Sequence, residues 1–264
     1  MGNQKSNINC AIHWVNWPVD SVLAFTTTQN SPFSAQSKER NLASTSPYGQ
    51  FNLGLHVNDN EIEVIERQAK VEKELLQGRK IQWLEQVHGN NVVHVETHHT
   101  THITADAAIT KNTAVALAVM TADCLPILLT DKKGKEIAAI HAGWRPLVKN
   151  IIAKTVNEME TKPADILCWL GPCIGQQAFE VGVEVKQAFI SLDNELSEQF
   201  TPTVEGKCFA NLQGIAKYLL EKLGVVHISS LDECTYQNRD KYYSYRRDNI
   251  TGRMASIIAI QPSK

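Results

Sequence analysis

The stretch that decides the fold reads AVALAVM at residues 114–120, ILL at 127–129 and IAAI at 137–140. The runs are short and apolar throughout, which is typical of strands buried on both faces. A turn is predicted between the second and third runs, from Asp131 to Gly134, because Asp and Gly are strong turn formers. The centre of the chain is therefore expected to form adjacent, fully buried strands.

Further strands and helices interleave on both sides of this centre. Strands are expected at 22–28, 81–87, 92–95, 166–170, 227–229 and 255–260, and helices at 58–76, from Pro146 onward, at 183–192 and at 211–223. The first helix should turn Ile62, Ile65, Ala69, Leu75 and Leu76 towards the core. Gly89-Asn-Asn91 predicts a hairpin between the strands at 81–87 and 92–95. The interpretation is one α/β (α+β) domain over residues 1–264, with a mixed sheet.

Composition excludes several classes of protein. The chain has 264 residues, 43% of them hydrophobic, and a net charge of −2, which suits a globular protein and argues against a nucleic-acid binder. No run of about 18 apolar residues predicts a membrane span. The six cysteines form no CxxC pair, and the first residues carry no apolar secretory segment, so a reducing cytoplasm is expected.

Three segments place a reactive side chain where an apolar run ends. They are QVHG at 86–89, TADC at 121–124 and HAGW at 141–144, which carry His88, Cys124 and His141. Imidazole and thiolate together suit Zn²⁺, with copper as the alternative. Two histidines and one cysteine leave a fourth position open, as in a catalytic zinc site that acidifies water or polarises a substrate oxygen.

The same residues permit other interpretations. A cysteine beside a buried strand also serves as a small apolar side chain, and Cys124 would be a nucleophile if His88 or His141 were its base. The spacing does not separate these alternatives. The denser group His94, His98, His99 and His102 lies among threonines, and we interpret it as a solvated loop. Residues 242–248 and 251–253 combine tyrosines with three arginines, which suits phosphate, carboxylate or a surface ion-pair loop.

Taken together, the motifs resemble a known family. They are NLGLHVND (52–59), QVHG (86–89), ADA (105–107), TADCLP (121–126), HAGW (141–144), GPCIG (171–175), FEVG (179–182), CT (234–235), SYRR (244–247) and TGR (251–253). In this order they resemble the YfiH-like, multicopper polyphenol oxidase (laccase-type) family, whose members are also described as purine nucleoside phosphorylases. The likeness runs from about Asn52 to Ile260.

The resemblance implies a zinc enzyme with one α/β domain similar to the catalytic domain of cytotoxic necrotizing factor. It implies phosphorolysis of adenosine, inosine and methylthioadenosine, with deamination of adenosine, by a monomer or homodimer acting on purine nucleosides and phosphate. The resemblance implies that His88, Cys124 and His141 are the metal ligands. From the residues themselves we expect Asp106 or Asp123 to orient ligands or to act as acid or base. We expect the substrate-binding residues to be Asn52, Arg145, Arg246 and Arg247, with the arginines positioning phosphate.

Two further function classes stay open, and two motifs depart from the family pattern. A copper-dependent phenol oxidase would use the same residues, although the chain lacks the repeated His-x-His pairs of a multicopper centre. A non-catalytic zinc-binding protein is the third class. Thr28 stands where the family has Arg, followed by a loop without its glycines, and Pro146 replaces a glycine after HAGWR. The first change is expected to alter substrate affinity; the second is tolerated in a first helical turn.

Overall fold

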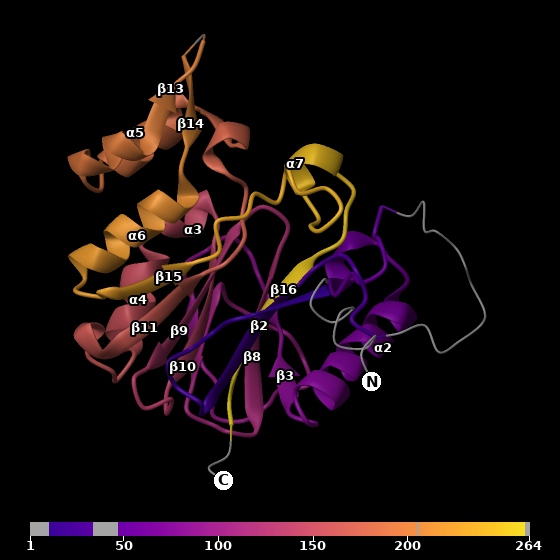
Figure 1. The fold of residues 1–264 in the computed structure, drawn as a ribbon. Helices are drawn as coiled ribbons and strands as arrows, with labels where there is room; N and C mark the ends of the chain where they lie inside the picture. The colour runs from indigo at the N-terminus through magenta and orange to yellow at the C-terminus, as the bar shows by residue number, and fades with distance from the viewer. Residues whose placement is uncertain (1–10, 34–46, 205, 262–264) are drawn as a thin grey trace.

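The computed structural model describes residues 11–33, 47–204 and 206–261 (Figure 1). Cys10 and most of the loop that follows Thr28 lie outside the described residues.

Two sheets form the centre of the molecule. The five-stranded sheet has the order β1 (Ile12–Trp14), β2 (Val22–Thr27), β16 (Met254–Ile260), β8 (Val115–Thr121) and β3 (Lys80–Gln82). The six-stranded sheet has the order β15 (His227–Ser230), β11 (Ile166–Leu170), β9 (Leu125–Asp131), β10 (Ile137–Ala142), β7 (Ala107–Thr110) and β5 (Val92–His94). Both sheets are mixed: β3–β8, β5–β7 and β11–β15 are parallel pairs and the others are antiparallel.

The two sheets pack face to face, and this explains the continuous apolar runs. In β8, side chains of one parity (Val115, Leu117, Val119) join those of β10 and β11 between the sheets, while the other parity (Ala116, Ala118, Met120) faces the outer layer. Strand side chains alternate between faces, so a strand covered on both sides must be apolar at every position.

Helices cover both outer faces (Figure 1). The outer face of the six-stranded sheet packs against α3 (Trp144–Val148), α4 (Ile151–Glu158), α5 (Val183–Ile190) and α6 (Leu212–Lys222). On the five-stranded sheet lie α2 (Glu61–Lys70) and the π-helical turn η2 (Val71–Leu75), which contribute Val71 and, just beyond, Leu76.

The smaller elements lie at the edges of the sheets. They are the sheet of β12 (Glu180–Gly182), β14 (Lys207–Ala210) and β13 (Phe200–Pro202), the pair β4 (Leu84–Glu85) and β6 (Ile103–Thr104), helix α7 (Tyr245–Asp248), and the 3-10 turns η1 (Leu55–Val57), η3 (Pro163–Asp165), η4 (Gln176–Ala178) and η5 (Asn194–Gln199). None of the helices in the described ranges is long and apolar enough to cross a membrane.

The mixed α/β architecture and the central strands are confirmed, whereas four details of the prediction are wrong. The strands form two main sheets instead of one. The segments around 81–85 and 92–94 do not pair as a hairpin, because β3 joins β8, β4 joins β6 and β5 joins β7. The helix at Pro146 begins at Trp144 and breaks at Asn150, whose φ is 62°. The first helix is capped by Asn60 and leaves Ile62 and Ile65 exposed.

Candidate metal centre and its pocket

The three residues predicted as metal ligands meet where the chain crosses from one sheet to the other. Cys124 lies in the short link between β8 of the five-stranded sheet and β9 of the six-stranded sheet. His141 is near the end of β10, paired with Pro126 of β9. His88 is in the loop after β4. The crossing of two packed sheets therefore brings together residues that are far apart in the sequence.

Their ligand atoms lie within 4.8 Å of one another. Cys124 Sγ is 3.8 Å from His88 Nε2, and the two imidazole rings meet edge to face at a centroid distance of 4.7 Å. His141 is buried, Cys124 is half-buried and His88 is exposed. The set thus has one side in the core and one side open to the pocket, as a site with an exchangeable position requires.

Asp106 orients His141 and the loop that carries His88. It is fully buried, and its Oδ1 lies 2.8 Å from His141 Nδ1, which leaves Nε2 free to bind. It also accepts hydrogen bonds from the backbone N–H groups of His88 and Gly89. The sheet register explains this position, because Ala107 pairs with Ile140, so Asp106 lies beside His141. A carboxylate behind a ligand histidine sets its tautomer and orientation.

The charges of the group favour a thiolate. Burial opposes ionisation of Cys124, but the charge and hydrogen bonds of the two histidines outweigh it and lower the thiol pKa to about 6. Burial likewise lowers the pKa of His141, but the charges of Cys124 and Asp106 and hydrogen bonds to both raise it to about 9. A thiolate is the form of cysteine that binds metals and that acts as a nucleophile.

The backbone at two site positions is strained. His88 has φ 57° and Asp123, next to Cys124, has φ 97°. Asp123 is held there by its carboxylate, which accepts hydrogen bonds from Thr235 Oγ1, Ser244 Oγ and the Arg246 N–H. Such left-handed conformations persist where surrounding contacts hold them, and they are common at functional sites. The Asp123 carboxylate thus uses its hydrogen bonds to hold residues 235–246 next to the site.

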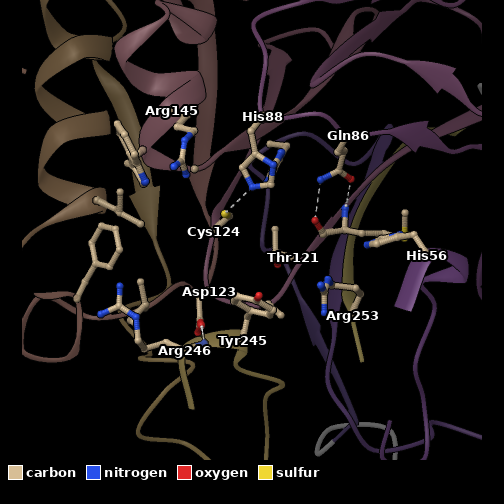
Figure 2. A pocket seen from close by; sticks show the side chains of 18 residues that line it. His56, Gln86, His88, Thr121, Asp123, Cys124, Arg145, Tyr245, Arg246 and Arg253 are labelled. Carbon is tan, nitrogen blue, oxygen red and sulfur yellow. Dashed lines mark hydrogen bonds between the residues drawn. The ribbon is translucent and has the colours of Figure 1, made fainter. Parts of the chain in front are cut away.

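A cavity of about 570 Å³ opens over the three ligand residues (Figure 2). Its apolar lining comes from Met120, Trp144, Ile174, Phe179 and Leu212, and its polar and cationic lining from His56, Gln86, Arg145, Arg246 and Arg253. The volume is in the range of pockets that hold a small organic ligand.

The predicted substrate-binding residues do not all reach this cavity. Arg145 lines it with its guanidinium 4.3 Å from the Trp144 ring centroid, and Arg246 lines it over Phe179. Arg247 is not among the lining residues, because its guanidinium donates to the carbonyls of Thr235, Tyr236 and Tyr242.

Asn52 also lies outside the lining. It is fully buried, and its Oδ1 accepts from the N–H groups of Gly54 and Arg253. Its Nδ2 donates to the Gly54 carbonyl and to Asp59. In this structure Asn52 supports the pocket wall instead of facing the cavity.

The sequence did not indicate Gln86 or His56 as pocket residues, and it indicated Arg253 only as one of three arginines suited to phosphate or carboxylate. Gln86 makes two hydrogen bonds to the backbone of Met120, which join the His88 loop to the end of β8 (Figure 2). Desolvation and the charge of Arg253 lower the pKa of His56 to about 4, so its imidazole is neutral. All three residues lie inside quoted motifs, and that membership was the available signal.

Gly143 supplies a first test of the metal site. A Cβ at this position would lie 2.8 Å from Cys124 Sγ and 3.4 Å from His88 Cδ2. Gly143→Ala is therefore expected to displace the sulfur and weaken zinc binding by about tenfold or more. Competition with a chromogenic chelator measures the change.

Gly175→Ala is the matched control. Gly143 and Gly175 have φ values of −68° and −69°, and a Cβ at Gly175 would lie 3.1 Å from the sulfur of Cys234, which is not in the ligand group. Equal zinc affinity in the two variants would contradict the assignment of Cys124.

Comparisons with known proteins agree with this architecture. A family model described as multi-copper polyphenol oxidoreductase laccase matches residues 34–261. The chain is 41% identical to a purine nucleoside phosphorylase of Haemophilus influenzae, over 92% of this chain and 96% of that protein. It is 42% identical to purine nucleoside phosphorylase YfiH of Escherichia coli, over 80% and 87% of the two chains.

Solved structures give the same result for the fold. Neisseria meningitidis protein NMB0706 superposes with a TM-score of 0.88 at 35% identity, covering 96% of this chain and 100% of that one. YlmD of Geobacillus stearothermophilus superposes with a TM-score of 0.84 at 26% identity, covering 94% and 96%.

Proposed function

The chain belongs to the multi-copper polyphenol oxidoreductase laccase family, and on that premise we propose that it is a zinc-dependent purine nucleoside phosphorylase. Its substrates would be adenosine, inosine and methylthioadenosine, each cleaved to free base and sugar phosphate. Deamination of adenosine is proposed as a second activity of the same site. The observation that carries the proposal is the pocket, which joins a His/Cys/His group, an aromatic and aliphatic wall, and guanidinium groups.

The donor set fits zinc. His88, Cys124 and His141 would hold the ion through two imidazoles and one thiolate, and Asp106 orients His141. When bound, zinc would supply a Lewis acid for a substrate oxygen or for water.

The chain's own residues account for substrate binding. A purine base is planar and largely apolar on its faces, which suits the wall formed by Phe179, Ile174 and Leu212. Guanidinium groups bind phosphate through paired hydrogen bonds, and the cavity is lined by three of them, those of Arg145, Arg246 and Arg253. Because Asp123 fixes the segment that carries Arg246, it acts as a positioning residue in this proposal. Holding base and phosphate together lowers the entropic part of the barrier.

Copper-dependent phenol oxidation is the second candidate. It is favoured by the description of the matching family and by the thiolate and imidazole donors, which also bind copper. Across the described ranges, however, His88, Cys124 and His141 are the one group of metal-binding geometry, whereas a multicopper centre needs several. A non-catalytic zinc-binding role is the third candidate.

The deciding experiment measures metal content and turnover on the same purified protein. Inosine with phosphate should yield hypoxanthine and ribose 1-phosphate, with no hypoxanthine released when phosphate is omitted. Adenosine without phosphate should yield inosine. Stoichiometric zinc with no turnover of any nucleoside would contradict the proposal, and copper with oxygen uptake on phenols would favour the second candidate.

The broader expectations stay proposals. We propose one domain over residues 1–264, a likeness to the cytotoxic necrotizing factor catalytic domain, a monomer or homodimer, and a reducing cytoplasmic location in which the Cys124 thiol stays free.

A further inference from the structure

Arg253 is a cation on the pocket wall. It is half-buried, and among the described residues its guanidinium forms no salt bridge. Burial lowers its pKa, the charges of Cys124 and Asp123 act against that lowering without a direct ion pair, and a guanidinium stays charged in proteins. A partly desolvated charge is costly unless an opposite charge or hydrogen-bond acceptor compensates it. The pocket wall therefore favours an anionic ligand at this place.

Two backbone hydrogen bonds and one side-chain contact fix the position of Arg253. Its N–H donates to Asn52 Oδ1 at 2.8 Å, and its carbonyl accepts from the Leu53 N–H at 3.2 Å. Its side-chain stem lies against Gly54, where a Cβ would come within 2.9 Å of Arg253 Cγ. The missing side chain at Gly54 is what makes room for the stem. A ligand bound here would meet a side chain that is already ordered, which favours affinity.

The hydrogen bonds of the guanidinium leave one edge open. Nη1 donates to the carbonyls of Thr251 and Gly252, both at 3.0 Å. A guanidinium has five N–H donors. Those of Nε and Nη2 donate to no group in the described part of the chain. Two such N–H groups side by side match a pair of phosphate oxygens.

A second polar group in the same wall also lacks a partner. Thr121 is one of the residues that line the pocket, it is only 2% exposed, and its buried hydroxyl has no hydrogen-bond partner within the described ranges. A buried hydroxyl without a partner is uncommon and costs free energy. In the view of Figure 2, Thr121 lies between Cys124 and Arg253, and both Thr121 and Arg253 line the pocket.

The other arginines of the pocket are placed differently. Arg145 and Arg246 are exposed and are on the opposite side of Cys124 from Arg253 in Figure 2. All three guanidiniums lie over an aromatic ring, those of Trp144, Phe179 and Tyr245 respectively. Solvent screens exposed charges, so each binds an anion more weakly than a half-buried one. The described lining includes one carboxylate, Asp123, whose oxygens already accept hydrogen bonds.

We propose that Arg253 and Thr121 form the subsite for inorganic phosphate, with the purine base on the aromatic side beyond Cys124. This assignment rests on the proposed phosphorylase function. In that reaction a phosphate oxygen bonds to the anomeric carbon of the ribose and the glycosidic C–N bond breaks. The bonding electron pair goes to the base, which takes a proton from dihydrogen phosphate.

The experiment measures binding of inorganic phosphate to the zinc-loaded protein by equilibrium dialysis, together with KM for phosphate. Arg253→Met should weaken both by about 10- to 100-fold, as expected for loss of a charge-assisted hydrogen-bonded pair. Arg253→Lys should be intermediate, since it keeps the charge and loses the paired donors. Arg79→Lys is the matched control, because Arg79 is a buried arginine that donates only to the Leu76 and Thr113 carbonyls.

Thr121→Val separates ligand binding from folding. Because its hydroxyl has no partner in the described structure, the valine variant should unfold at the same urea concentration or higher, while KM for phosphate rises severalfold. Thr130→Val should unfold at a lower urea concentration and leave KM for phosphate unchanged, because the Thr130 hydroxyl donates to the Glu136 carbonyl outside the pocket. Unchanged phosphate binding in both Arg253→Met and Thr121→Val would overturn the subsite. Arg253-dependent phosphate binding without nucleoside cleavage would support the subsite and refute the phosphorylase function.

Discussion

Cys124→Ala is expected to remove the bound metal and to lower nucleoside phosphorolysis more than about a hundredfold, since loss of a partner outside the ligand set already costs about 10- to 100-fold. The alanine takes away a thiolate whose pKa, about 6, makes it ionised at neutral pH. Two imidazoles alone form an incomplete tetrahedral set. Metal analysis after gel filtration and a hypoxanthine release assay measure the two effects on the same sample.

Cys208→Ala is the control for this variant. Cys208 is 2% exposed, lies in β14 and does not line the pocket, so its replacement should leave metal content and turnover unchanged. The metal content also distinguishes the two roles that the sequence left open. A nucleophilic cysteine would lose activity on replacement and keep its metal, and that outcome would refute the ligand assignment.

The buried strands could be predicted because a continuous apolar run is stable only where both of its faces are covered. A continuous apolar run such as that at 114–120 must be covered on both faces, and the structure covers it with a second sheet and an outer layer. The number of sheets was not predictable, since a run of this kind looks the same whether a helix or another sheet covers it.

Predictions from local sequence patterns were wrong where contacts between distant segments determined burial or strand pairing. In α2 the aliphatic pattern placed Ile62 and Ile65 in the core, but the buried positions are Val64 and Gln68. Gln68 is buried because its amide donates to the Leu53 carbonyl of the preceding segment, and no periodicity predicts such a contact. The hairpin at Gly89 failed for a similar reason. Asp106, distant in sequence, accepts the N–H groups of that loop and directs it to the site.

The metal-binding group could be predicted from the sequence, whereas the phosphate subsite was indicated only in part, by the three arginines of residues 242–253. His88, Cys124 and His141 have side chains whose chemistry is informative at any strand end. Arg253 is informative only once its partners are known, because an arginine in a loop is usually solvated or paired. Thr121 had only its place in the TADCLP motif as a sequence signal, since what distinguishes it in the described structure is a buried hydroxyl without a hydrogen-bond partner.

Asp106→Asn is expected to produce the second large effect, on stability and metal affinity together. Its buried carboxylate accepts from His141 Nδ1 and from the N–H groups of Val87, His88 and Gly89, so an amide must turn a donor towards donors. We expect the free energy of unfolding to fall by about 2–4 kcal/mol and zinc affinity to fall by about 10- to 100-fold. Urea unfolding of the metal-free protein and chelator competition measure the two quantities.

The pH dependence of stability gives an independent check on Asp106. Burial opposes ionisation, but the hydrogen bonds and charge of His141 and the loop N–H groups hold the folded-state pKa of Asp106 below its ordinary value. Its stabilising contribution is therefore present above about pH 4 and is lost as the pH falls through the lower folded-state pKa. As the pH falls below about 4, the free energy of unfolding of metal-free Asp106→Asn should therefore decrease less than that of the metal-free parent protein.

Asp131→Asn is the matched control that separates the two effects of Asp106. Asp131 is also a buried carboxylate that accepts backbone N–H groups, those of Lys133, Lys135 and Glu136, but it lies at the far end of β9 from Cys124. Its replacement should lower the free energy of unfolding by a similar amount and leave zinc affinity unchanged. If both variants lost zinc affinity equally, the loss would follow from general destabilisation, and Asp106 would have no specific part in orienting His141.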